Sequence, residues 1–533
     1  MKLSNESLKD KKFWEKANFS LPNFNRQKSI TAALTTPKWL HFGAGNIFRA
    51  FPAALYQELL EQGLETAGLI VAVRYDRKTI EKCFNQYDDL SLLVTLKSDG
   101  STEKKVIASI ASYLGMECDY DTLKSIFTNP SLQIASFTIT EKGYNLTGTN
   151  EEYLPEIAED LNCAPGLAKS FQGRIAALCH ERYEKGCFPL ALVSMDNCSN
   201  NGDKLFVIIE TFAKSWIKKG FVNSGFLDYV CNPKKLSFPS TMIDKITPGP
   251  DSEVQKKLEE LGLENMQSLT AGKNTIIAPF VNAEETQYLV IEDSFPNGRP
   301  PLEKTGVLFT DRKTVEKTEK MKVGTCLNPI HTALAIFGCL LGYKRMNVAI
   351  KDTDLLKLAE GIGYTEGLPV VIDPGIINPK KFIDEVINIR IPNPFLPDTP
   401  QRIATDSSQK IPVRFGGTLK TYKALGKDFN ELKFIPLVFA GWLRYLLGVD
   451  DNGNPFEVSP DPLYENLKIA LAGIKLGQRQ EDIHSKLKPI LSSSSLFGLD
   501  LYESALGEKV EEYFRQMLLR AGEVRKLLSS IGE

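Results

Sequence analysis

The chain has 533 residues, with 64 Lys and Arg against 66 Asp and Glu and a formal net charge of −2 at pH 7. This balance excludes a global electrostatic field of the kind that gathers nucleic acid or an anionic membrane. The composition, 42% hydrophobic and 24% charged, is typical of a globular protein. The length exceeds what one hydrophobic core usually serves, so two domains are expected.

The start of the chain, MKLSNESLKDKKFWEK, is polar and lacks the apolar region of a secretory signal. The longest apolar run, residues 332–342, is too short to span a bilayer. A cytoplasmic protein without membrane attachment is therefore expected. The nine cysteines occur singly, without a CxxC pair, and the four histidines are scattered. This pattern predicts reduced, mostly buried thiols and no metal site.

Residues 37–73 show the pattern of a strand, a glycine turn, a helix and a second strand. The apolar run 39–42 stops at Gly43-Ala44-Gly45, and from Asn46 onward the apolar residues recur at helical spacing. The apolar segment 68–73 then predicts the second strand. This order of elements is a βαβ unit.

Further strands are predicted at 92–96, 134–140 and 189–195. Helical stretches alternate with the strands, for example at 203–219. Such alternation favours a mostly parallel sheet covered on both faces. Beyond about residue 310 the pattern changes to long amphipathic segments, at 329–342, 353–361, 433–447, 463–475 and 507–528. The predicted fold is an α/β Rossmann-like doubly wound domain, residues 1–311, followed by a mostly α-helical domain, residues 312–533. Segment 294–306, rich in Pro and Gly, is the expected connector.

The glycine turn after the first strand suits a dinucleotide. Glycines permit a tight turn and let backbone amides approach a pyrophosphate at a helix N-terminus. The usual third glycine is replaced by Phe48, so the fingerprint is incomplete, and a plain strand-to-helix turn remains the alternative. The candidate cofactor-binding residues of this turn are Gly43, Ala44, Gly45, Asn46, Ile47 and Phe48.

Discrimination between NAD and NADP normally resides just after the second strand, where the sequence reads Arg74-Tyr75-Asp76-Arg77. Asp76 is suited to the ribose hydroxyls of NAD, whereas Arg74 or Arg77 is suited to the 2′-phosphate of NADP. We expect NAD, with NADP as the alternative.

The string KVGTCLNPIH, residues 322–331, precedes an apolar helix. Asn is a good N-cap and Pro is favoured at the next position, which would place His331 in the first turn. The positive helix terminus should then keep His331 neutral. An ordinary capped helix with Lys322 as a solvated surface charge is the alternative interpretation.

Several blocks of the chain resemble the polyol-specific long-chain dehydrogenases, the mannitol dehydrogenase family. The blocks lie in family order across almost the whole chain. They are GAGNIFRAF (43–51), TITEKGY (138–144), SMDNCSNNG (194–202), FPSTMIDKITP (238–248), IEDSFPNGRP (291–300), EKMKVGTCLNPIH (319–331), RIATDSSQKIP (402–412) and GWLRYLLGVDDNG (441–453).

One spacing departs from the family pattern. The family usually places its catalytic Lys five residues before the Asn, whereas Lys322 precedes Asn328 by six. Because the preceding residues fit the family motif E-x-M-K, the extra residue is expected within 323–327. Lys320 is the weaker candidate for the same role.

The resemblance implies a role for each matching residue. Lys322 would be the general base that takes the hydroxyl proton as a secondary alcohol becomes a ketone. Asn328 and Asn197 would donate hydrogen bonds to the oxygen where negative charge develops. The substrate contacts would come from His331, Arg402, Lys410 and Asp244. As alternatives, Asp196-Asn197 would form an Asx turn, Asp244 would cap a helix, and Arg402 and Lys410 would lie on solvated faces.

These motifs predict a metal-independent, NAD(P)-dependent oxidoreductase acting on an open-chain sugar acid or polyol. Within the family, CLNPIHTALA and NPFLPDTPQRIATD look closest to fructuronate reductases, which interconvert fructuronate and mannonate. Mannitol 2-dehydrogenase and tagaturonate reductase are the alternatives, and a catalytically silent nucleotide-sensing protein is the alternative from another class. The active site is expected in the cleft between the two domains, at the carboxyl ends of the sheet strands. A monomer or homodimer with a small-molecule substrate is expected, and neither nucleic acid nor membrane as a partner.

Overall fold

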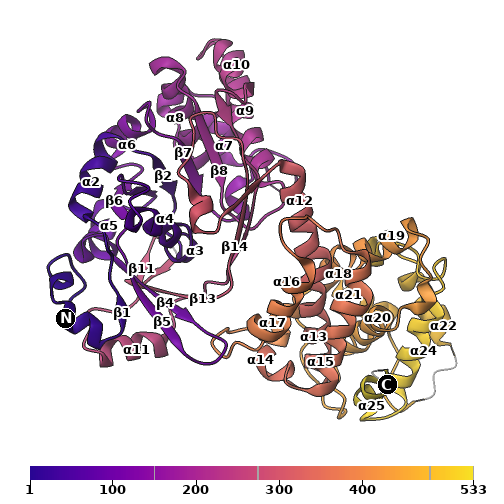
Figure 1. Ribbon diagram of the computed structural model, residues 1–533. Helices are drawn as coiled ribbons and strands as arrows, with labels where there is room; N and C mark the ends of the chain where they lie inside the picture. The colour runs from indigo at the N-terminus through magenta and orange to yellow at the C-terminus, as the bar shows by residue number, and fades with distance from the viewer. Residues whose placement is uncertain (149, 273–274, 479–481, 532–533) are drawn as a thin grey trace. The chain divides into compact units, whose positions relative to one another are not determined.

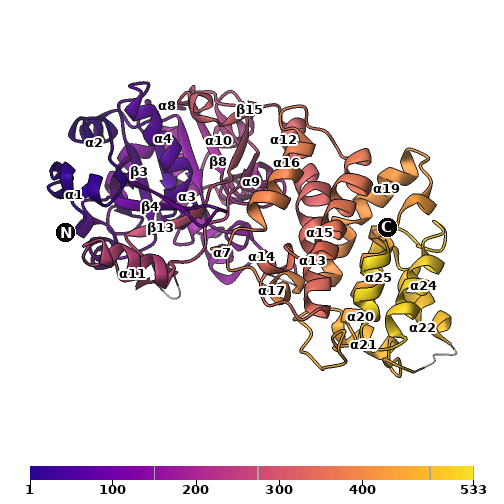
Figure 2. The ribbon, with the colours of Figure 1, turned by 60° about the horizontal axis from the view of Figure 1, so that its bottom comes forward.

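The computed structural model describes residues 1–148, 150–272, 275–478 and 482–531 (Figures 1 and 2). The chain divides into two compact units. Unit 1 comprises residues Met1–Lys97 and Ser101–Glu316, and unit 2 comprises Ser98–Gly100 and Lys317–Glu533. The change from one unit to the other on the main path of the chain therefore falls inside a helix, α12 (Arg312–Met321).

Unit 1 is built on a six-stranded parallel sheet with the order β6-β3-β2-β7-β8-β9. The order runs outward in both directions from β2, so the sheet is doubly wound, as predicted. Every residue of β2, β3, β7 and β8 is buried, as expected of central parallel strands covered on both faces. The strands are β2 (Trp39–Phe42), β3 (Leu69–Val73), β6 (Ile110–Gly115), β7 (Ile134–Phe137), β8 (Leu190–Ser194) and β9 (Leu236–Ser237).

Alternate residues of these strands face two separate hydrophobic cores. Leu40 and Phe42 of β2 belong to one core, which also contains side chains from α2, α6, α8 and α9, whereas Trp39 belongs to the other, with α3, α4 and α5. The helix predicted to follow the glycine turn is broken at Phe51 into α3 and α4. The helices are α1 (Lys11–Lys16), α2 (Arg26–Thr35), α3 (Asn46–Ala50), α4 (Pro52–Glu61), α5 (Arg77–Cys83), α6 (Tyr120–Phe127), α7 (Pro155–Asp160), α8 (Phe171–Gly186), α9 (Asn201–Lys218), α10 (Gly225–Cys231) and α11 (Ser252–Glu260).

Unit 1 contains three further sheets that were not predicted from the sequence. Segment 92–96 is a strand, β4 (Ser91–Leu96), but it lies in a four-stranded sheet, where it pairs antiparallel with β5 (Thr102–Ile107) and parallel with β13 (Phe280–Glu284). The fourth strand is β1 (Phe19–Ser20). β10 (Thr241–Asp244), β14 (Tyr288–Glu292) and β15 (Leu308–Thr310) form a three-stranded sheet, and β11 (Leu269–Ala271) pairs with β12 (Thr275–Ile277).

Segment 294–306 is not the connector between the two units. The strand that follows it, β15, returns to pair in parallel with β14. Arg312, just beyond β15, ion-pairs with Glu292 at the end of β14, with 2.9 Å between Nε and Oε2. The segment is thus an internal excursion of unit 1. The prediction of a strand over 134–140 was also too long, because β7 ends at Phe137.

Unit 2 is helical, as predicted, and is arranged around α13, in which residues 332–340 are all buried. α15, α17 and α20 pack against α13. Segment 507–528 forms two helices rather than one, because the chain breaks at Gly522, whose φ is +87°. The helices after α12 are α13 (Asn328–Leu340), α14 (Met346–Ala349), α15 (Thr353–Glu360), α16 (Pro379–Glu385), α17 (Pro400–Ala404), α18 (Ser407–Arg414), α19 (Gly416–Ala424), α20 (Phe434–Tyr445), α21 (Tyr464–Ala470), α22 (Ile483–Leu491), α23 (Ser494–Phe497), α24 (Gly507–Leu518) and α25 (Glu523–Ile531).

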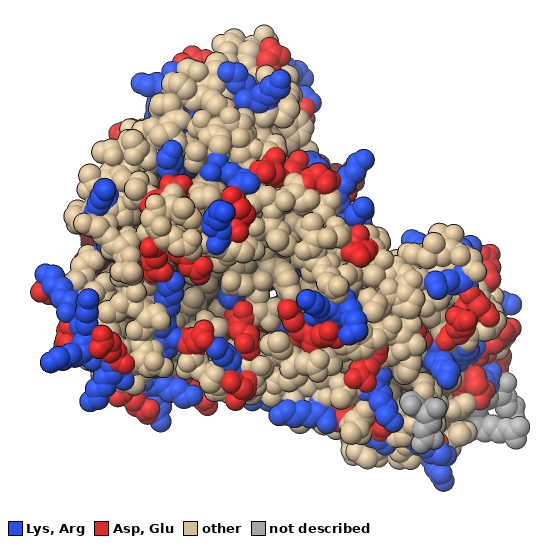
Figure 3. Space-filling view, viewed as in Figure 1, with Lys and Arg blue, Asp and Glu red and all other residues tan. Residues whose placement is uncertain are grey.

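The structure can be compared with what composition predicted for surface charge, for the apolar run and for the cysteines. Figure 3 shows Lys and Arg interspersed with Asp and Glu over the visible face, as the near-zero net charge implies. The helical run Arg312–Leu340 is long and apolar enough to cross a membrane, but 72% of its most apolar window is buried within the fold, which is the behaviour of a core helix. All nine cysteines, each in the described part of the chain, are free, but only Cys83, Cys179, Cys326 and Cys339 are buried, so the expectation of mostly buried thiols was wrong.

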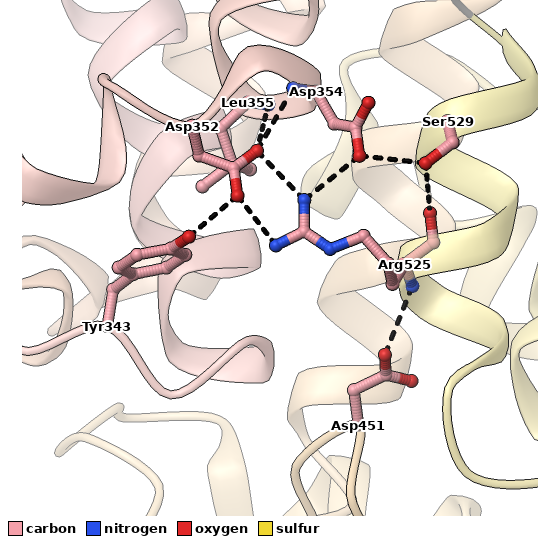
Figure 4. A network of polar contacts seen from close by, with 7 residues as sticks. All are labelled: Tyr343, Asp352, Asp354, Leu355, Asp451, Arg525 and Ser529. Carbon is pink, nitrogen blue, oxygen red and sulfur yellow. Dashed lines mark hydrogen bonds and ion pairs between the residues drawn. The ribbon is translucent and has the colours of Figure 1, made fainter.

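The C-terminal helix α25 is fastened to unit 2 by a polar network (Figure 4). Arg525 donates to Asp352 and Asp354 at the start of α15, and Ser529 donates to Asp354 at 2.7 Å. Asp451 accepts backbone hydrogen bonds from the first turn of α25. Burial alone would raise the pKa of Asp352, but hydrogen bonds from Arg525 and Tyr343 hold it at about 2. The network thus stabilises the folded state as long as its carboxylates are ionised.

Replacing Arg525 by Met leaves both carboxylates without their cation. We expect the free energy of unfolding of the full chain at pH 7 to fall by about 1–2 kcal/mol, because the charged hydrogen bonds are partly exposed. Lys526→Met is the matched control, since Lys526 on the same helix ion-pairs with Glu523 from an exposed position, and it should cost about 0–1 kcal/mol. Urea unfolding followed by circular dichroism measures both variants.

The effect of Arg525→Met should depend on pH. Because the folded-state pKa of Asp352 lies below its ordinary value of 3.8, the contribution of this carboxylate is complete above about pH 5 and is lost as the pH falls toward 2. The stability difference between the wild-type protein and the variant should therefore shrink between pH 6 and pH 3.5. An equal difference at both pH values would show that packing of the side chain, and not its charge, fastens the helix.

Candidate active site

The glycine turn lies at the carboxyl end of β2. Gly43 has a φ of +116°, and a Cβ at this position would lie 2.5 Å from the backbone oxygen of Thr138. Its N–H donates to Ala72 O at 2.9 Å, which ties the turn to β3. At Gly45, by contrast, a Cβ would meet no atom within 4 Å. Gly43 is therefore needed for the turn itself, while Gly45 leaves open space in front of the first turn of α3. These residues fit a phosphate group that approaches the backbone closely.

The side chains after the turn mainly hold it in place. Asn46 donates to Pro248 O at 3.0 Å and accepts from Arg49 at 3.1 Å, so it joins the turn to the loop after β10. Ala44 and Phe48 are buried, and the Phe48 ring stacks on His41 with 3.4 Å between centroids. Ile47 is half-buried. Phe48, which replaces the third glycine, thus fills the core under the turn.

The residues after β3 include a helix cap and one member of an ion pair. Asp76 is the N-cap of α5, and its Oδ1 accepts from Thr79 N at 2.7 Å. Hydrogen bonds from the side chain and the backbone of Thr79 lower the pKa of Asp76. Arg77 ion-pairs with Asp119, whereas Arg74 is exposed. Asp119 thus neutralises Arg77, whereas the Arg74 and Asp76 side chains are both exposed.

Asn197 and Asp244 lie in unit 1, at the carboxyl ends of β8 and β10. Asn197 is exposed, and Asp244 is buried as the last residue of its strand. The helix-cap alternative for Asp244 was wrong, because Asp251 caps the next helix, α11.

Asp196 has a role that sequence reasoning missed. Its carboxylate accepts from the backbone N–H groups of Ile139 (2.8 Å) and Thr140 (3.0 Å) and from the Tyr144 hydroxyl (2.7 Å), so it clamps the ends of β7 and β8 together. Burial raises the pKa of Asp196. Thr140, one of the clamped residues, has a φ of +64°, a backbone conformation that such a clamp helps to hold.

In unit 2, Lys322 opens a π-helical turn, Lys322–Cys326. The turn is closed by a hydrogen bond from Leu327 N to Lys322 O at 3.1 Å, and the Thr418 hydroxyl donates to Gly324 O at 3.1 Å. Lys322 is 2% exposed, whereas Lys320 lies on the solvated side of α12. A π-turn contains one more residue than an α-helical turn, and such turns are frequent at functional sites. The segment 323–327, where the extra residue of this chain is expected, overlaps this turn at residues 323–326.

The predicted cap at Asn328 was wrong. α13 begins at Asn328 itself, its N-cap is Leu327, and His331 N donates to Leu327 O at 3.0 Å. Leu327 is a bend, with φ −122° and ψ −63°, between the π-turn and α13, so α13 has its own N-terminus one turn before His331.

His331 is held neutral by burial and by neighbouring cations. Its pKa falls to about 3, first because the ring is desolvated and then because of Arg414, Arg390, Arg402 and Lys410. Nε2 lies 3.4 Å from Oδ2 of Asp398, whose other oxygen pairs with Arg402. A neutral imidazole both donates and accepts one hydrogen bond, which suits a substrate hydroxyl.

Arg402 and Lys410 differ in their surroundings. The Arg402 side chain is 60% exposed, although it is paired with Asp398. Lys410 is half-buried and donates to the backbone oxygens of Ile403 (3.3 Å) and Thr405. Burial and then Arg414 lower the pKa of Lys410. The solvated-face alternative therefore does not describe Lys410.

Unit 2 thus gathers Lys322 on the π-turn and Asn328 and His331 at the start of α13. α17 packs against α13, and α18 packs against both the π-turn and α19. Arg414, on α18, was missed by sequence reasoning, although its place one helical turn after Lys410 was a signal available in the sequence. No group of three or more His, Cys, Asp or Glu side chains suited to a metal ion occurs among the residues that the structure describes.

Comparison with known proteins assigns the chain to a family. The profile of the mannitol dehydrogenase Rossmann domain matches residues 37–304, and that of the mannitol dehydrogenase C-terminal domain matches residues 314–518. A D-mannonate oxidoreductase of Thermotoga maritima is 51% identical over 537 residues, which cover 100% of this chain and 99% of that protein. The chain belongs to the mannitol dehydrogenase family.

Other proteins that resemble the chain are more distant. A polyol:NADP oxidoreductase of Gluconobacter oxydans is 29% identical over 85% of this chain and 87% of its own. The mannitol 2-dehydrogenase of Pseudomonas fluorescens, solved with NAD and D-mannitol, is 26% identical, with a TM-score of 0.68 and 99% of each chain covered. A D-sorbitol dehydrogenase shares the fold, with a TM-score of 0.78 at 24% identity over 97% of this chain and 98% of that one. The present chain is accordingly an oxidoreductase that acts on a CH–OH group with a nicotinamide dinucleotide.

The neutrality of His331 can be tested through stability. Because the folded-state pKa of about 3 lies below the ordinary 6.5, the unfolded chain binds an extra proton below pH 6.5, and the folded state loses stability as the pH falls. His331→Gln removes this proton. Between pH 6 and pH 4, we expect the variant to lose less unfolding free energy than the wild type, the slopes differing by up to about 1.4 kcal/mol per pH unit. Urea unfolding at several pH values measures the slopes, and identical slopes would contradict the assignment.

Proposed function

We propose that the protein is an NAD-dependent oxidoreductase that interconverts mannonate and fructuronate, a secondary alcohol and a ketone on an open-chain sugar acid. The observation that carries the proposal is the 51% identity, over the full length of both chains, to a protein named D-mannonate oxidoreductase. Mannitol 2-dehydrogenase and tagaturonate reductase activities are the alternatives within the family. The silent nucleotide-sensing alternative is disfavoured because Lys322, Asn328 and His331 are all present.

The dinucleotide would be held by unit 1. The open backbone at Gly43, Ala44 and Gly45 would receive the pyrophosphate, with Asn46, Ile47 and Phe48 supporting the turn and Asp76 or Arg74 facing the adenosine ribose. When bound, the nicotinamide supplies the hydride chemistry of the reaction. NAD is favoured over NADP because Asp76 is exposed and Arg77 is already paired with Asp119.

The proton chemistry would be carried by Lys322. In oxidation, its uncharged amine takes the proton of the substrate hydroxyl, and in reduction it returns that proton. Asn328 and Asn197 would donate amide hydrogen bonds to the reacting oxygen as negative charge develops on it. Burial supports this choice of base, since Lys322 is shielded from water whereas Lys320 is not.

The remaining residues would hold the substrate. His331, neutral at physiological pH, would bind a hydroxyl, and Arg402 and Lys410 would bind the rest of the chain. Asp244 would orient the polar groups around the reacting carbon. We further propose a cytoplasmic enzyme, monomeric or homodimeric, with functional domains 1–311 and 312–533 and without nucleic-acid or membrane partners.

Lys322→Ala tests the base. We expect kcat for mannonate oxidation to fall by on the order of 10²–10⁴, the range for loss of a general base, while the affinity for NAD changes little. Lys320→Ala is the matched control, because it removes a lysine two residues away that is exposed, and it should retain near-normal turnover. Absorbance of the reduced cofactor, with mannonate, altronate, mannitol and arabinitol as substrates, measures both variants. Collapse of turnover in Lys320→Ala alone would transfer the role to Lys320, and no turnover of any substrate by the wild type would favour the silent protein.

Asp76 tests the cofactor preference, but it also caps α5. Asp76→Ser retains a capping side chain and removes the charge, whereas Asp76→Ala removes both and should therefore also lower stability. If the carboxylate binds the ribose, both variants should weaken NAD more than NADP, and only the Ala variant should lose stability. Fluorescence titration with NADH and NADPH measures the affinities. Tighter binding of NADPH than NADH by the wild type would show that Arg74 dominates instead.

A further inference from the structure

Arg414 is a cation that none of the roles proposed above uses. It is the last residue of α18, and its Nη1 donates a hydrogen bond to the Thr332 hydroxyl. Thr332 follows His331 on α13, and its hydroxyl donates to Asn328 O at 2.8 Å. The guanidinium therefore reaches the turn of α13 that carries Asn328 and His331.

Several cations lie around this turn. The cations that lower the pKa of His331 are Arg414, Arg390, Arg402 and Lys410, in decreasing order of effect. Asp398 neutralises one of them, because it pairs with Arg402. Arg414, in contrast, forms no ion pair with any residue that the structure describes. The cation with the largest effect on His331 is thus one that has no carboxylate partner.

The environment of Arg414 makes this charge costly. Burial alone lowers its pKa, to about 10. Removing a cation from water costs several kcal/mol unless an anion compensates it. Lys410 precedes Arg414 by one helical turn on α18, and like charges at this spacing destabilise a helix. Both costs are offset when an anion binds at this place.

Resting on the proposed oxidation of a sugar acid, we propose that Arg414 binds the carboxylate of that acid and makes the enzyme prefer acids to neutral polyols. A guanidinium offers a planar fork that forms two parallel hydrogen bonds with a carboxylate. The bond from Nη1 to Thr332 fixes the plane of the group, and within the described part of the chain Nε and Nη2 make no hydrogen bond. Arg402 is less suited to this task because Asp398 already neutralises it.

Mannonate and mannitol are matched probes for this inference, because they share a carbon chain and differ in one terminal group, a carboxylate against a hydroxymethyl. In Arg414→Met we expect kcat/KM for mannonate to fall on the order of 100-fold, mainly through KM, because a buried charged partner is lost. The value for mannitol should change less than about threefold. Arg414→Lys keeps the charge without the fork and should lose about tenfold with mannonate. If Arg414→Met does not fold, the comparison of mannonate with mannitol is made with Arg414→Lys.

Two comparison variants separate carboxylate binding from a structural role. Arg402→Met should lower kcat/KM for both substrates and leave their ratio within about threefold, since its charge is already neutralised. Thr332→Val removes the hydroxyl that Arg414 contacts but keeps the cation, and it should retain the preference for mannonate. If Arg414 only braced α13, its replacement would lower both substrates together and Thr332→Val would reproduce that loss, which would overturn the inference.

Calorimetric titration of mannonate into the full-length protein saturated with NADH gives a readout that does not require turnover. Wild type should bind mannonate on the order of 100-fold more tightly than Arg414→Met. A wild-type enzyme that prefers mannonate, with the preference intact in Arg414→Met, would overturn the role of Arg414 and leave the proposed function standing. A wild-type enzyme that oxidises mannitol but neither oxidises nor binds mannonate would overturn both.

Discussion

The hydrogen bond from Leu327 N to Lys322 O is the constraint on which the geometry of unit 2 depends. It closes the π-turn between α12 and α13, and the bend at Leu327 then leads into α13. A π-turn contains one more residue than an α-helical turn. An additional residue before Asn328 is thus accommodated outside α13, whose residues 332–340 all stay buried.

The charges of unit 2 are arranged around α13. Asp398 lies between Arg402 and His331, so one carboxylate serves two neighbours. The same packing that buries α13 desolvates His331, and burial is the largest cause of its low pKa. Neutrality of the imidazole is thus a property of the tertiary fold and of four neighbouring cations.

Sequence could predict the features whose causes are local. The strand–turn–helix around Gly43 was recognisable because the buried strand, the glycine turn and the helical spacing are all short-range patterns. The second sheet was not, because β4 pairs with β13, far along the chain, and such pairing leaves no local mark. Asn328 and Pro329 were recognisable as a helix start, and α13 does begin at Asn328, but the N-cap at Leu327 and the π-turn before it could not be predicted from local patterns. Arg414 was not predicted as a site residue, because only the folded structure shows that no carboxylate among the described residues pairs with it.

In the proposed enzyme, discrimination between acids and polyols depends on which cations of unit 2 are already paired with a carboxylate of the protein. The Arg402–Asp398 pair can bind hydroxyls without presenting net charge, whereas Arg414 presents a charge that a carboxylate would balance. An anion bound there would offset one of the cations that depress the pKa of His331 and would raise it from about 3. Burial, the larger cause, would remain, and the ordinary pKa of 6.5 already lies below neutral pH. The same turn of α13 can therefore face an anionic substrate and still keep its imidazole neutral for a neighbouring hydroxyl.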